Sequence, residues 1–291
     1  MVIQRPPVGL SEAAFPMGTI VISGATGAVG GAAATALANG GHQLVLLGRD
    51  PNRLSEAART LHAVRGGSTV ETVVCDLSSL GSVRNAASEL GARFARIDAL
   101  VHSAAVFLRD RRMTAEGNEA MLATNHLGPF LLTNLLLERL RASAPARVVV
   151  VSAPSTTELD FEDLQGEKRW GALTQFGRSK MANLLFAYAL ARRQPVTQVT
   201  SNVLFPGLVK SGLMKDANAA VRGLSGMMSR SPEAAGNALA WLTVDPSLAT
   251  TSGQFYKLAK LDRSNAYSRD AAVQDRLWSE SERLVGLRRS G

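Results

Sequence analysis

Short apolar runs alternate with longer amphipathic stretches along most of this chain. The short runs are rich in β-branched and aliphatic residues and end in glycine, proline or a polar turn, as buried strands do. Strands are predicted at 19–23, 43–47, 69–75, 99–103, 147–152, 199–204 and 253–256. Helices are predicted at about 31–39, 51–64, 80–94, 116–140 and 175–193, and a further helix begins at 231–233. Apolar strands separated by helices indicate a parallel sheet that is covered on both faces.

The turn after the first strand is rich in glycine and leads directly into an alanine-rich helix. Glycines at this place let the backbone approach a pyrophosphate, which the N-terminus of the helix attracts. Between a strand and a helix this pattern predicts a dinucleotide site, with a merely tight turn as the alternative. The predicted contacts in the turn are Gly24, Thr26, Gly27, Ala28, Val29 and Gly30. Together with the order of elements, the site predicts an α/β fold of the doubly wound Rossmann type, with a mostly parallel seven-stranded sheet and helices on both faces.

The end of the second predicted strand indicates which dinucleotide binds. An acidic residue about twenty positions after the glycines would bond the ribose 2′-hydroxyl of NAD, but Arg49 comes first here. An arginine can pair with the 2′-phosphate of NADP, so NADP(H) is the predicted cofactor. Asp50 follows immediately and leaves two alternatives open, a contact with the hydroxyl or the start of the next helix.

Length and composition predict one domain. The chain has 291 residues, a size that open α/β sheets reach with a single core. Residues 1–18 are predicted to form an N-terminal arm and residues 19–291 a single Rossmann domain. The stretch 209–231 is rich in glycine, serine, methionine and lysine, which is typical of a mobile lid over a substrate site. An ordinary surface loop is the alternative for this stretch.

Charge and cysteine content narrow the expected partners. The hydrophobic share of 46% and the charged share of 19% are ordinary for a soluble protein, and no apolar run is long enough to cross a membrane. The net charge of +8 is spread over dispersed arginines, so neither nucleic acid nor a membrane is a predicted partner. The lone cysteine, Cys75, rules out an internal disulfide and favours a cytoplasmic location. A small-molecule carbonyl substrate is the expected partner.

Four sequence blocks carry a resemblance to a known family. They are Cys75-Asp76-Leu77, Asn-His-Leu-Gly at 125–128, Phe-Gly-Arg-Ser-Lys-Met-Ala-Asn at 176–183, and Pro206-Gly207. With the glycine turn, they make the chain from Thr19 to about Leu287 similar to the short-chain dehydrogenase/reductase family, and especially to its retinol-dehydrogenase-like branch. The resemblance implies a nicotinamide cofactor and chemistry at a carbonyl or alcohol carbon.

The resemblance also implies a catalytic set, from which this chain departs. In the family a tyrosine donates the proton, a lysine one turn later lowers the pKa of that tyrosine and holds the ribose, a serine orients the substrate oxygen, and an asparagine supports the lysine. Lys180 and Asn125 match that set. Phe176 stands in place of the tyrosine, and Ala153 stands in place of the serine. Ser152 is the residue before Ala153 and completes the predicted catalytic group, unless its side chain faces the sheet.

Further cofactor contacts follow from the same resemblance. The family's Asn-Asn-Ala-Gly stretch corresponds to His-Ser-Ala-Ala at 102–105, and the family's middle glycine corresponds to Ala28. Ser211 occupies the place of a threonine that contacts the nicotinamide carboxamide in the family, with a helix cap in the lid as the alternative. The contacts implied in this way are Asp76, Leu77, Ser103, Ala104, Lys180, Pro206, Gly207 and Ser211.

Phe176 decides what chemistry remains. Phenylalanine has no ionisable proton, so residue 176 cannot contribute the general acid catalysis that is typically worth about 10²–10⁴-fold. Hydride transfer belongs to the cofactor, and the proton is expected from a substrate hydroxyl or from water. Side chains after the fourth and fifth strands are further candidates, although each is more often structural at such a place. They are His102, Ser152, Ser155 and Thr156.

The sequence therefore predicts an atypical ketoreductase that uses NADPH on a specialised carbonyl of the aromatic-polyketide type. An NADP-binding pseudoenzyme that acts as a sensor or scaffold is one alternative. A non-redox isomerase, dehydratase or cyclase on the same scaffold is another. Leucine-rich stripes at 131–137 and 184–186 are typical of core packing, and in the family two such helices also form a dimer face, so a homodimer is a further prediction.

Overall fold

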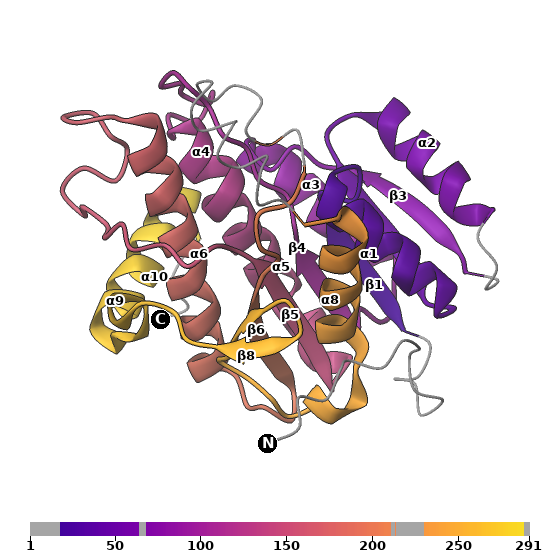
Figure 1. Ribbon diagram of the computed structural model, residues 1–291. Helices are drawn as coiled ribbons and strands as arrows, with labels where there is room; N and C mark the ends of the chain where they lie inside the picture. Colours follow the sequence, from indigo (N-terminus) through magenta and orange to yellow (C-terminus); the bar gives the residue numbers. More distant parts are fainter. Residues whose placement is uncertain (1–17, 64–67, 211–212, 214–229, 288–291) are drawn as a thin grey trace.

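A twisted sheet runs through the centre of the molecule, with helices on both of its faces (Figure 1). The computed structural model describes residues 18–63, 68–210, 213 and 230–287. Within these residues the sheet has eight strands in the order β3-β2-β1-β4-β5-β6-β7-β8. They are β1 (Thr19–Ser23), β2 (Gln43–Gly48), β3 (Val70–Val74), β4 (Ala99–His102), β5 (Ala146–Val151), β6 (Val199–Phe205), β7 (Phe255–Lys257) and β8 (Lys260–Asp262). All neighbouring strands pair in parallel except β7 and β8, which confirms the predicted Rossmann architecture.

The eighth strand corrects the predicted count of seven. β8 pairs antiparallel with β7 and places Leu261 opposite Tyr256. All three residues of β8 are exposed and two of them are charged, so no apolar pattern marks the strand in the sequence. The turn between the two strands also lacks the usual signal, because Leu258 adopts a φ of 55°, a conformation more typical of glycine or asparagine.

Two layers of helices cover the sheet. One face carries α1, α2 and α8, and the other carries α3, α5, α6 and α10 (Figure 1). The helices are α1 (Ala28–Asn39), α2 (Pro51–His62), α3 (Leu80–Arg93), α4 (Ala120–Leu122), α5 (Gly128–Ala142), α6 (Ala172–Arg193), α8 (Pro232–Val244), α9 (Ala266–Arg269) and α10 (Ala271–Val285), with the π-helical turn η1 (Ala123–Leu127) and the 3₁₀ turn η3 (Pro246–Leu248). The single helix predicted at 116–140 is therefore α4, η1 and α5 in succession.

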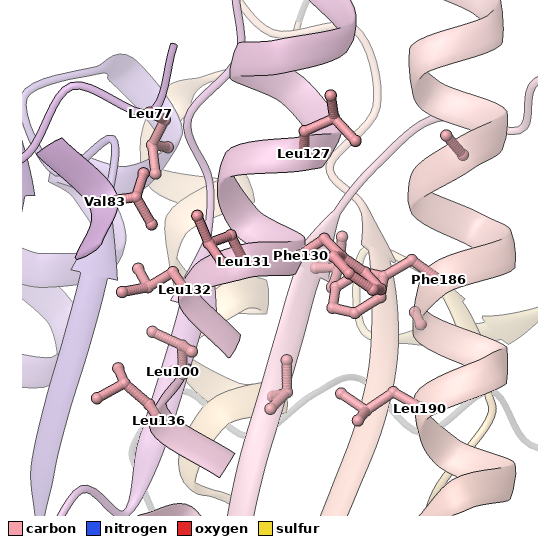
Figure 2. Packing of buried hydrophobic residues seen from close by; sticks show 14 of the residues in the cluster. Leu77, Val83, Leu100, Leu127, Phe130, Leu131, Leu132, Leu136, Phe186 and Leu190 are labelled. Carbon is pink, nitrogen blue, oxygen red and sulfur yellow. The ribbon is translucent and has the colours of Figure 1, made fainter. Parts of the chain in front are cut away.

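An aromatic cluster joins the helices of the larger core layer. Phe130 of α5, Phe186 of α6 and Trp278 of α10 have ring centroids between 4.9 and 6.1 Å apart. Figure 2 shows Phe130 beside Phe186, whose rings meet edge to face, with Leu131 and Leu132 on the side towards Val83 of α3. Leu131, Leu132 and Leu136 of the first leucine stripe and residues 184–186 of the second are buried within this chain, whereas Leu135 is exposed. The helix α10 packs across α6. The homodimer stays a prediction.

Two further predictions from composition concern the environment of the chain. In the described part of the chain, no helix combines the length and the apolar character that crossing a membrane requires. Cys75 is buried at the end of β3, and burial together with the charge of Asp76 raises its pKa to about 12. Such a thiol packs in the core and is a poor nucleophile.

Candidate active site

The glycine turn after β1 packs directly on the loop after β4. Gly24 has a φ of +74°, and a Cβ atom there would lie 2.6 Å from the main-chain nitrogen of Ala104. A Cβ at Gly30 would lie 2.4 Å from the carbonyl oxygen of Gly24. Gly27 is exposed, and its Cβ would meet nothing closer than 3.2 Å. Gly24 and Gly30 are therefore needed for the conformation of the turn itself. Gly27 leaves the exposed side of the turn without a side chain.

The N-terminus of α1 is open to an anion. Gly27 is the N-cap, no side chain caps the helix, and the first turn contains no acidic residue. The first N–H groups of a helix carry partial positive charge and attract phosphate. Thr26, Ala28 and Val29 surround this end of the helix, as the sequence predicts for a pyrophosphate site.

The start of α2 brings two arginines to the same edge. Asp50 accepts hydrogen bonds from the main-chain nitrogens of Asn52 at 2.9 Å and Arg53 at 3.2 Å, so its carboxylate is the N-cap of α2. Arg53 donates to the carbonyl oxygen of Thr26 at 3.0 Å. Arg49 and Arg53 are both exposed beside the turn. Sequence reasoning missed Arg53. Its position four residues after Arg49, in the first turn of the predicted helix, could have indicated a second phosphate contact.

Asp76 and Leu77 follow β3, and Ser103 follows β4. We call these residues, together with the glycine turn, the candidate dinucleotide cradle. Asp76 accepts hydrogen bonds from the main-chain nitrogen and the hydroxyl of Ser78, at 2.9 and 2.7 Å. Leu77 is buried beside it. The hydroxyl of Ser103 is buried and has no hydrogen-bond partner among the described residues. A buried hydroxyl without a partner is costly, and a polar group of a bound ligand would satisfy it.

Asn125 joins the loop after β4 to α6 from within the π-helical turn. Its Oδ1 accepts from the main-chain nitrogen of Val106 at 2.8 Å, and its Nδ2 donates to the carbonyl oxygen of Val106 at 3.0 Å. The same Nδ2 donates to the hydroxyl of Ser179 at 2.9 Å. A π-helical turn inside a longer helix frequently marks a functional site. The side chain of Asn125 is thus fully used in positioning.

Phe176 and Lys180 lie one turn apart on α6 and face the same space. The ring of Phe176 packs edge-on against the ring of Phe107, with centroids 5.6 Å apart. The ammonium nitrogen of Lys180 lies 5.4 Å from the centroid of the Phe176 ring. Lys180 is only 6% exposed, and burial lowers its pKa to about 8. The position of the family's acid thus holds an aromatic ring, with a buried cation beside it.

Other candidate side chains are engaged in the framework. The hydroxyl of Ser152 donates to the carbonyl oxygen of Lys180 at 2.9 Å, and that of Ser155 donates to Gly177 at 2.8 Å. Ser152 therefore faces α6, and its predicted catalytic role finds no support in this geometry. Thr156 is exposed.

His102 is also a packing residue. Its Nε2 lies 2.8 Å from the hydroxyl of Thr133, which itself donates to the carbonyl oxygen of Pro129 at 2.9 Å. The ring must therefore donate from Nε2, and it is neutral because burial lowers its pKa to about 3. His102 is not available as a proton donor at neutral pH.

An apolar wall packs against Phe176. Phe107 and Met121 are buried, and further apolar side chains pack against them. These are Val106, Leu108, Trp170, Ala172, Phe176 and Leu213. Pro206 and Gly207 directly follow β6, and Gly207 has a φ of +78°. Ser211 and most of the predicted lid at 209–231 lie outside the described residues.

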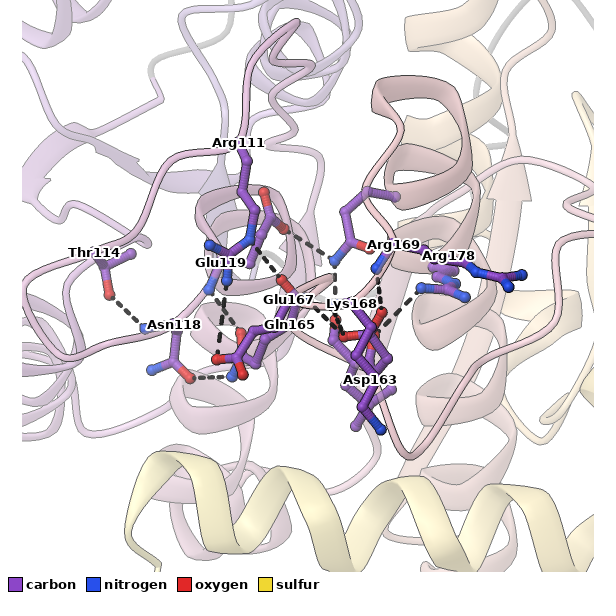
Figure 3. A network of polar contacts seen from close by, with 12 residues as sticks. Arg111, Thr114, Asn118, Glu119, Asp163, Gln165, Glu167, Lys168, Arg169 and Arg178 are labelled. Atoms are coloured by element: carbon purple, nitrogen blue, oxygen red, sulfur yellow. Dashed lines mark hydrogen bonds and ion pairs between the residues drawn. The ribbon is translucent and has the colours of Figure 1, made fainter.

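A polar network, buried at Glu119 and Asp163 and exposed at its margin, links the start of α4 to the segment before α6 (Figure 3). Glu119 is fully buried and accepts hydrogen bonds from the main chain at the start of α4 and from Gln175 of α6. Asp163 accepts from the main-chain nitrogens of residues 167–169, and these bonds, led by the one from Lys168, lower the pKa of its carboxyl. The segment that carries Trp170 is thereby held against α6, a constraint that sequence reasoning missed.

Comparisons with known proteins agree with this geometry. A family profile described as "short chain dehydrogenase" matches residues 18–222. Retinol dehydrogenase 13 of Homo sapiens is 33% identical over 288 residues, which cover 95% of this chain and 87% of that protein. The "Putative daunorubicin C-13 ketoreductase DnrU" of Streptomyces sp. (strain C5) is 33% identical over 293 residues, covering 98% of this chain and 99% of that protein. A crystal structure of an uncharacterized protein from Mycobacterium paratuberculosis has a TM-score of 0.70 at 28% identity, covering 92% of this chain and 93% of the other.

Proposed function

Because this chain belongs to the short-chain dehydrogenase/reductase family, we propose that it is an NADPH-dependent ketoreductase that works without a tyrosine acid. The observation that carries the proposal is a glycine turn before an uncapped helix N-terminus, combined with Phe176, a ring without a hydroxyl, where the family has its tyrosine. A ketoreductase name on a relative that matches nearly the whole chain supports reduction of a carbonyl.

The residues of the cradle fit a nicotinamide dinucleotide. The uncapped N-terminus of α1 suits the pyrophosphate, and the buried hydroxyl of Ser103 lacks a partner that a ligand would supply. Lys180 presents N–H donors that suit the ribose hydroxyls. When bound, the nicotinamide supplies the hydride.

NADP is favoured over NAD by the charges at the start of α2. Arg49 and Arg53 offer two guanidinium groups to a 2′-phosphate, and guanidinium pairs well with phosphate. Asp50, the one acidic residue there that suits a 2′-hydroxyl, is already the N-cap of α2. The edge therefore attracts the phosphorylated cofactor.

The wall around Phe176 favours an aromatic or polycyclic ketone. Phe176 and Trp170 are half-buried, and they pack on the buried side chains of Phe107 and Met121. Aromatic rings bind flat apolar substrates through large contact areas and edge-to-face packing. The substrate class named for the Streptomyces relative is consistent with such a wall.

Isotope transfer tests the proposal. The purified full-length chain is incubated with a panel of aromatic and polycyclic ketones and with NADPH deuterated at either face of C4. We expect NADPH to be consumed and deuterium to appear at the carbinol carbon of the product. Binding of NADPH without consumption across the panel would instead support a sensor or scaffold. A product formed without deuterium and without NADPH oxidation would support an isomerase, dehydratase or cyclase.

A further inference from the structure

We propose that Lys180 donates the proton to the carbonyl oxygen of the substrate, in place of the absent tyrosine, while it also holds the ribose of the cofactor. The inference rests on the proposed ketoreductase function and names the acid of that same site. It replaces the substrate hydroxyl or water that the sequence suggests as the proton source.

Three serine hydroxyls near Phe176 are already used by the main chain of α6. Three serines each donate to a carbonyl oxygen of this helix, at 2.8 or 2.9 Å: Ser152 to Lys180, Ser155 to Gly177, and Ser179 to Phe176. His102 donates to Thr133 on α5 and is neutral. Thr156 is exposed, and a threonine hydroxyl without a base is a very weak acid. These side chains do not supply a proton to a carbonyl beside Phe176.

Lys180 differs from them in having its donors free. Its ammonium donates no hydrogen bond within the described part of the chain, although the side chain is only 6% exposed. The nitrogen lies 5.4 Å from the centroid of the ring that stands in the tyrosine's place. A carbonyl oxygen that approaches this ring therefore comes within reach of the ammonium, directly or through one water.

Burial makes the Lys180 ammonium a stronger acid, so it can release a proton near neutral pH. The pKa of the ammonium is lowered to about 8 by burial, and an acid works best when its pKa lies near the working pH. The titratable groups on the elements packed against α6 are Glu119 before α4, His126 of η1, Arg147 of β5, Tyr267 and Arg269 of α9, and Asp275, Arg276, Glu280, Glu282 and Arg283 of α10. Burial alone accounts for the shift of the Lys180 pKa.

In the proposed step, one N–H bond of the Lys180 ammonium breaks and the O–H bond of the alcohol forms on the carbonyl oxygen. The carbonyl carbon is reduced by the two electrons of the hydride, and NADPH is oxidised to NADP⁺. Lys180 is left as a neutral amine and regains its proton from water. An ammonium has three N–H donors, so two remain for the ribose hydroxyls during the transfer.

The first test separates proton donation from cofactor binding. Lys180→Arg keeps a cation and N–H donors for the ribose, but a guanidinium does not release its proton in a protein. We expect Lys180→Arg to bind NADPH within about tenfold of the wild type by calorimetry. We expect its kcat at saturating NADPH and ketone to fall by about 10²–10⁴-fold, the range for loss of a general acid.

The second test uses responses that a purely structural lysine would not give. Wild-type kcat should fall as pH rises through the pKa of Lys180, because only the ammonium can donate, and this fall should be absent in Lys180→Arg. Added methylamine should restore activity to Lys180→Ala in proportion to its concentration. In ligand-free protein labelled with [ε-¹³C]lysine, the NMR signal that disappears in Lys180→Arg should titrate near pH 8.

The outcomes distinguish this inference from the function on which it rests. If the wild type oxidises NADPH with a ketone while Lys180→Arg, saturated with both ligands, turns over within about tenfold of the wild-type rate, Lys180 is not the acid and the ketoreductase stands. If the wild type never oxidises NADPH, the function itself fails. Should Lys180→Arg not fold, the amine rescue of Lys180→Ala decides, and absence of rescue overturns the proposal.

Discussion

Arg53 donates a hydrogen bond of 3.0 Å from its guanidinium to the carbonyl oxygen of Thr26, 27 residues earlier in the chain. This bond ties the first turn of α2 to the glycine turn after β1. It also holds a second cation beside Arg49, at the edge where a 2′-phosphate would lie. The proposed role of both arginines is to pair with the 2′-phosphate of NADPH, and this role can be tested by measuring cofactor binding.

Replacing Arg53 by alanine is expected to weaken NADPH binding roughly tenfold more than NADH binding, because both cofactors lose the bond to Thr26 but only NADPH loses a partner for its 2′-phosphate. A hydrogen bond to a charged group is worth about 1.5–3 kcal/mol, and exposure reduces that value. Calorimetry with both cofactors measures the difference. Arg59→Ala, at an exposed position in the last turn of α2, is the matched control. Equal weakening of both cofactors would contradict a phosphate contact.

Phe176→Tyr tests whether the site lacks an acid. If another group already donates the proton, the added hydroxyl should change kcat by less than about tenfold, because general acid catalysis is already present. The variant keeps the ring that packs on Phe107, so thermal unfolding should change little. If turnover of an aromatic ketone instead rose by about two orders of magnitude, the full contribution of a general acid, the wild type would have no effective acid.

Ser152→Ala should affect stability more than turnover. The hydroxyl of Ser152 is buried and donates to the carbonyl oxygen of Lys180, and such a bond contributes about 0.5–1.5 kcal/mol to the free energy of unfolding. Urea unfolding should show a loss in this range, while the turnover rate stays nearly unchanged. A drop in turnover of about two orders of magnitude, with stability intact, would restore Ser152 to the catalytic group.

Two buried histidines should make the protein sensitive to acid. Burial lowers the pKa of His102 and of His126 from 6.5 to about 3, so between these values the unfolded chain binds more protons than the folded one. The free energy of unfolding should therefore fall as pH decreases below about 6.5, by up to about 1.4 kcal/mol per pH unit for each histidine. Denaturant unfolding from pH 7 to pH 4 measures this. His126→Gln should show a smaller slope, and an unchanged slope would contradict the assignment.

Trp278→Ala should destabilise the protein by about 3–5 kcal/mol, the usual cost of removing a large buried aromatic side chain. Trp278 of α10 packs against Phe130 of α5 and Phe186 of α6, and so attaches α10 to these two helices. Urea unfolding measures the change. Trp241→Ala is the comparison, because Trp241 is only half-buried and packs at the margin of the other core layer, with its ring edge-on to Tyr256. A smaller loss for Trp278 than for Trp241 would contradict the role assigned to α10.

Elements with strong local signals could be predicted from the sequence. Apolar strands such as β5 and the glycine turn between β1 and α1 are found where the pattern places them. Asp50 is an intermediate case, because Asp-Pro fits both a helix start and a ribose contact, and the two bonds from the main chain of α2 decide for the start.

Features that depend on contacts between distant segments could not be predicted. The direction of the Ser152 side chain depends on the packing of α6 against the end of β5. Glu119 has no local pattern, since its partners come from α4, α6 and the segment near Gln165. The contact between Phe107 and Phe176 joins the loop after β4 to α6, and α4, η1, α5 and β5 lie between them in the sequence. The partners of such side chains can be identified only from the folded structure.

The close approach of Gly24 to Ala104 has a consequence for how this lineage can change. Side chains are barred at Gly24 and Gly30 by the protein's own main chain, so a descendant that abandoned redox chemistry would still keep both glycines. Gly27 faces outward, and a side chain there would meet less steric hindrance than at Gly24 or Gly30. It would therefore be the first of the three glycines to be substituted once no dinucleotide had to fit. Among homologous chains, the residue at this one position is the informative marker of whether the coenzyme is still in use.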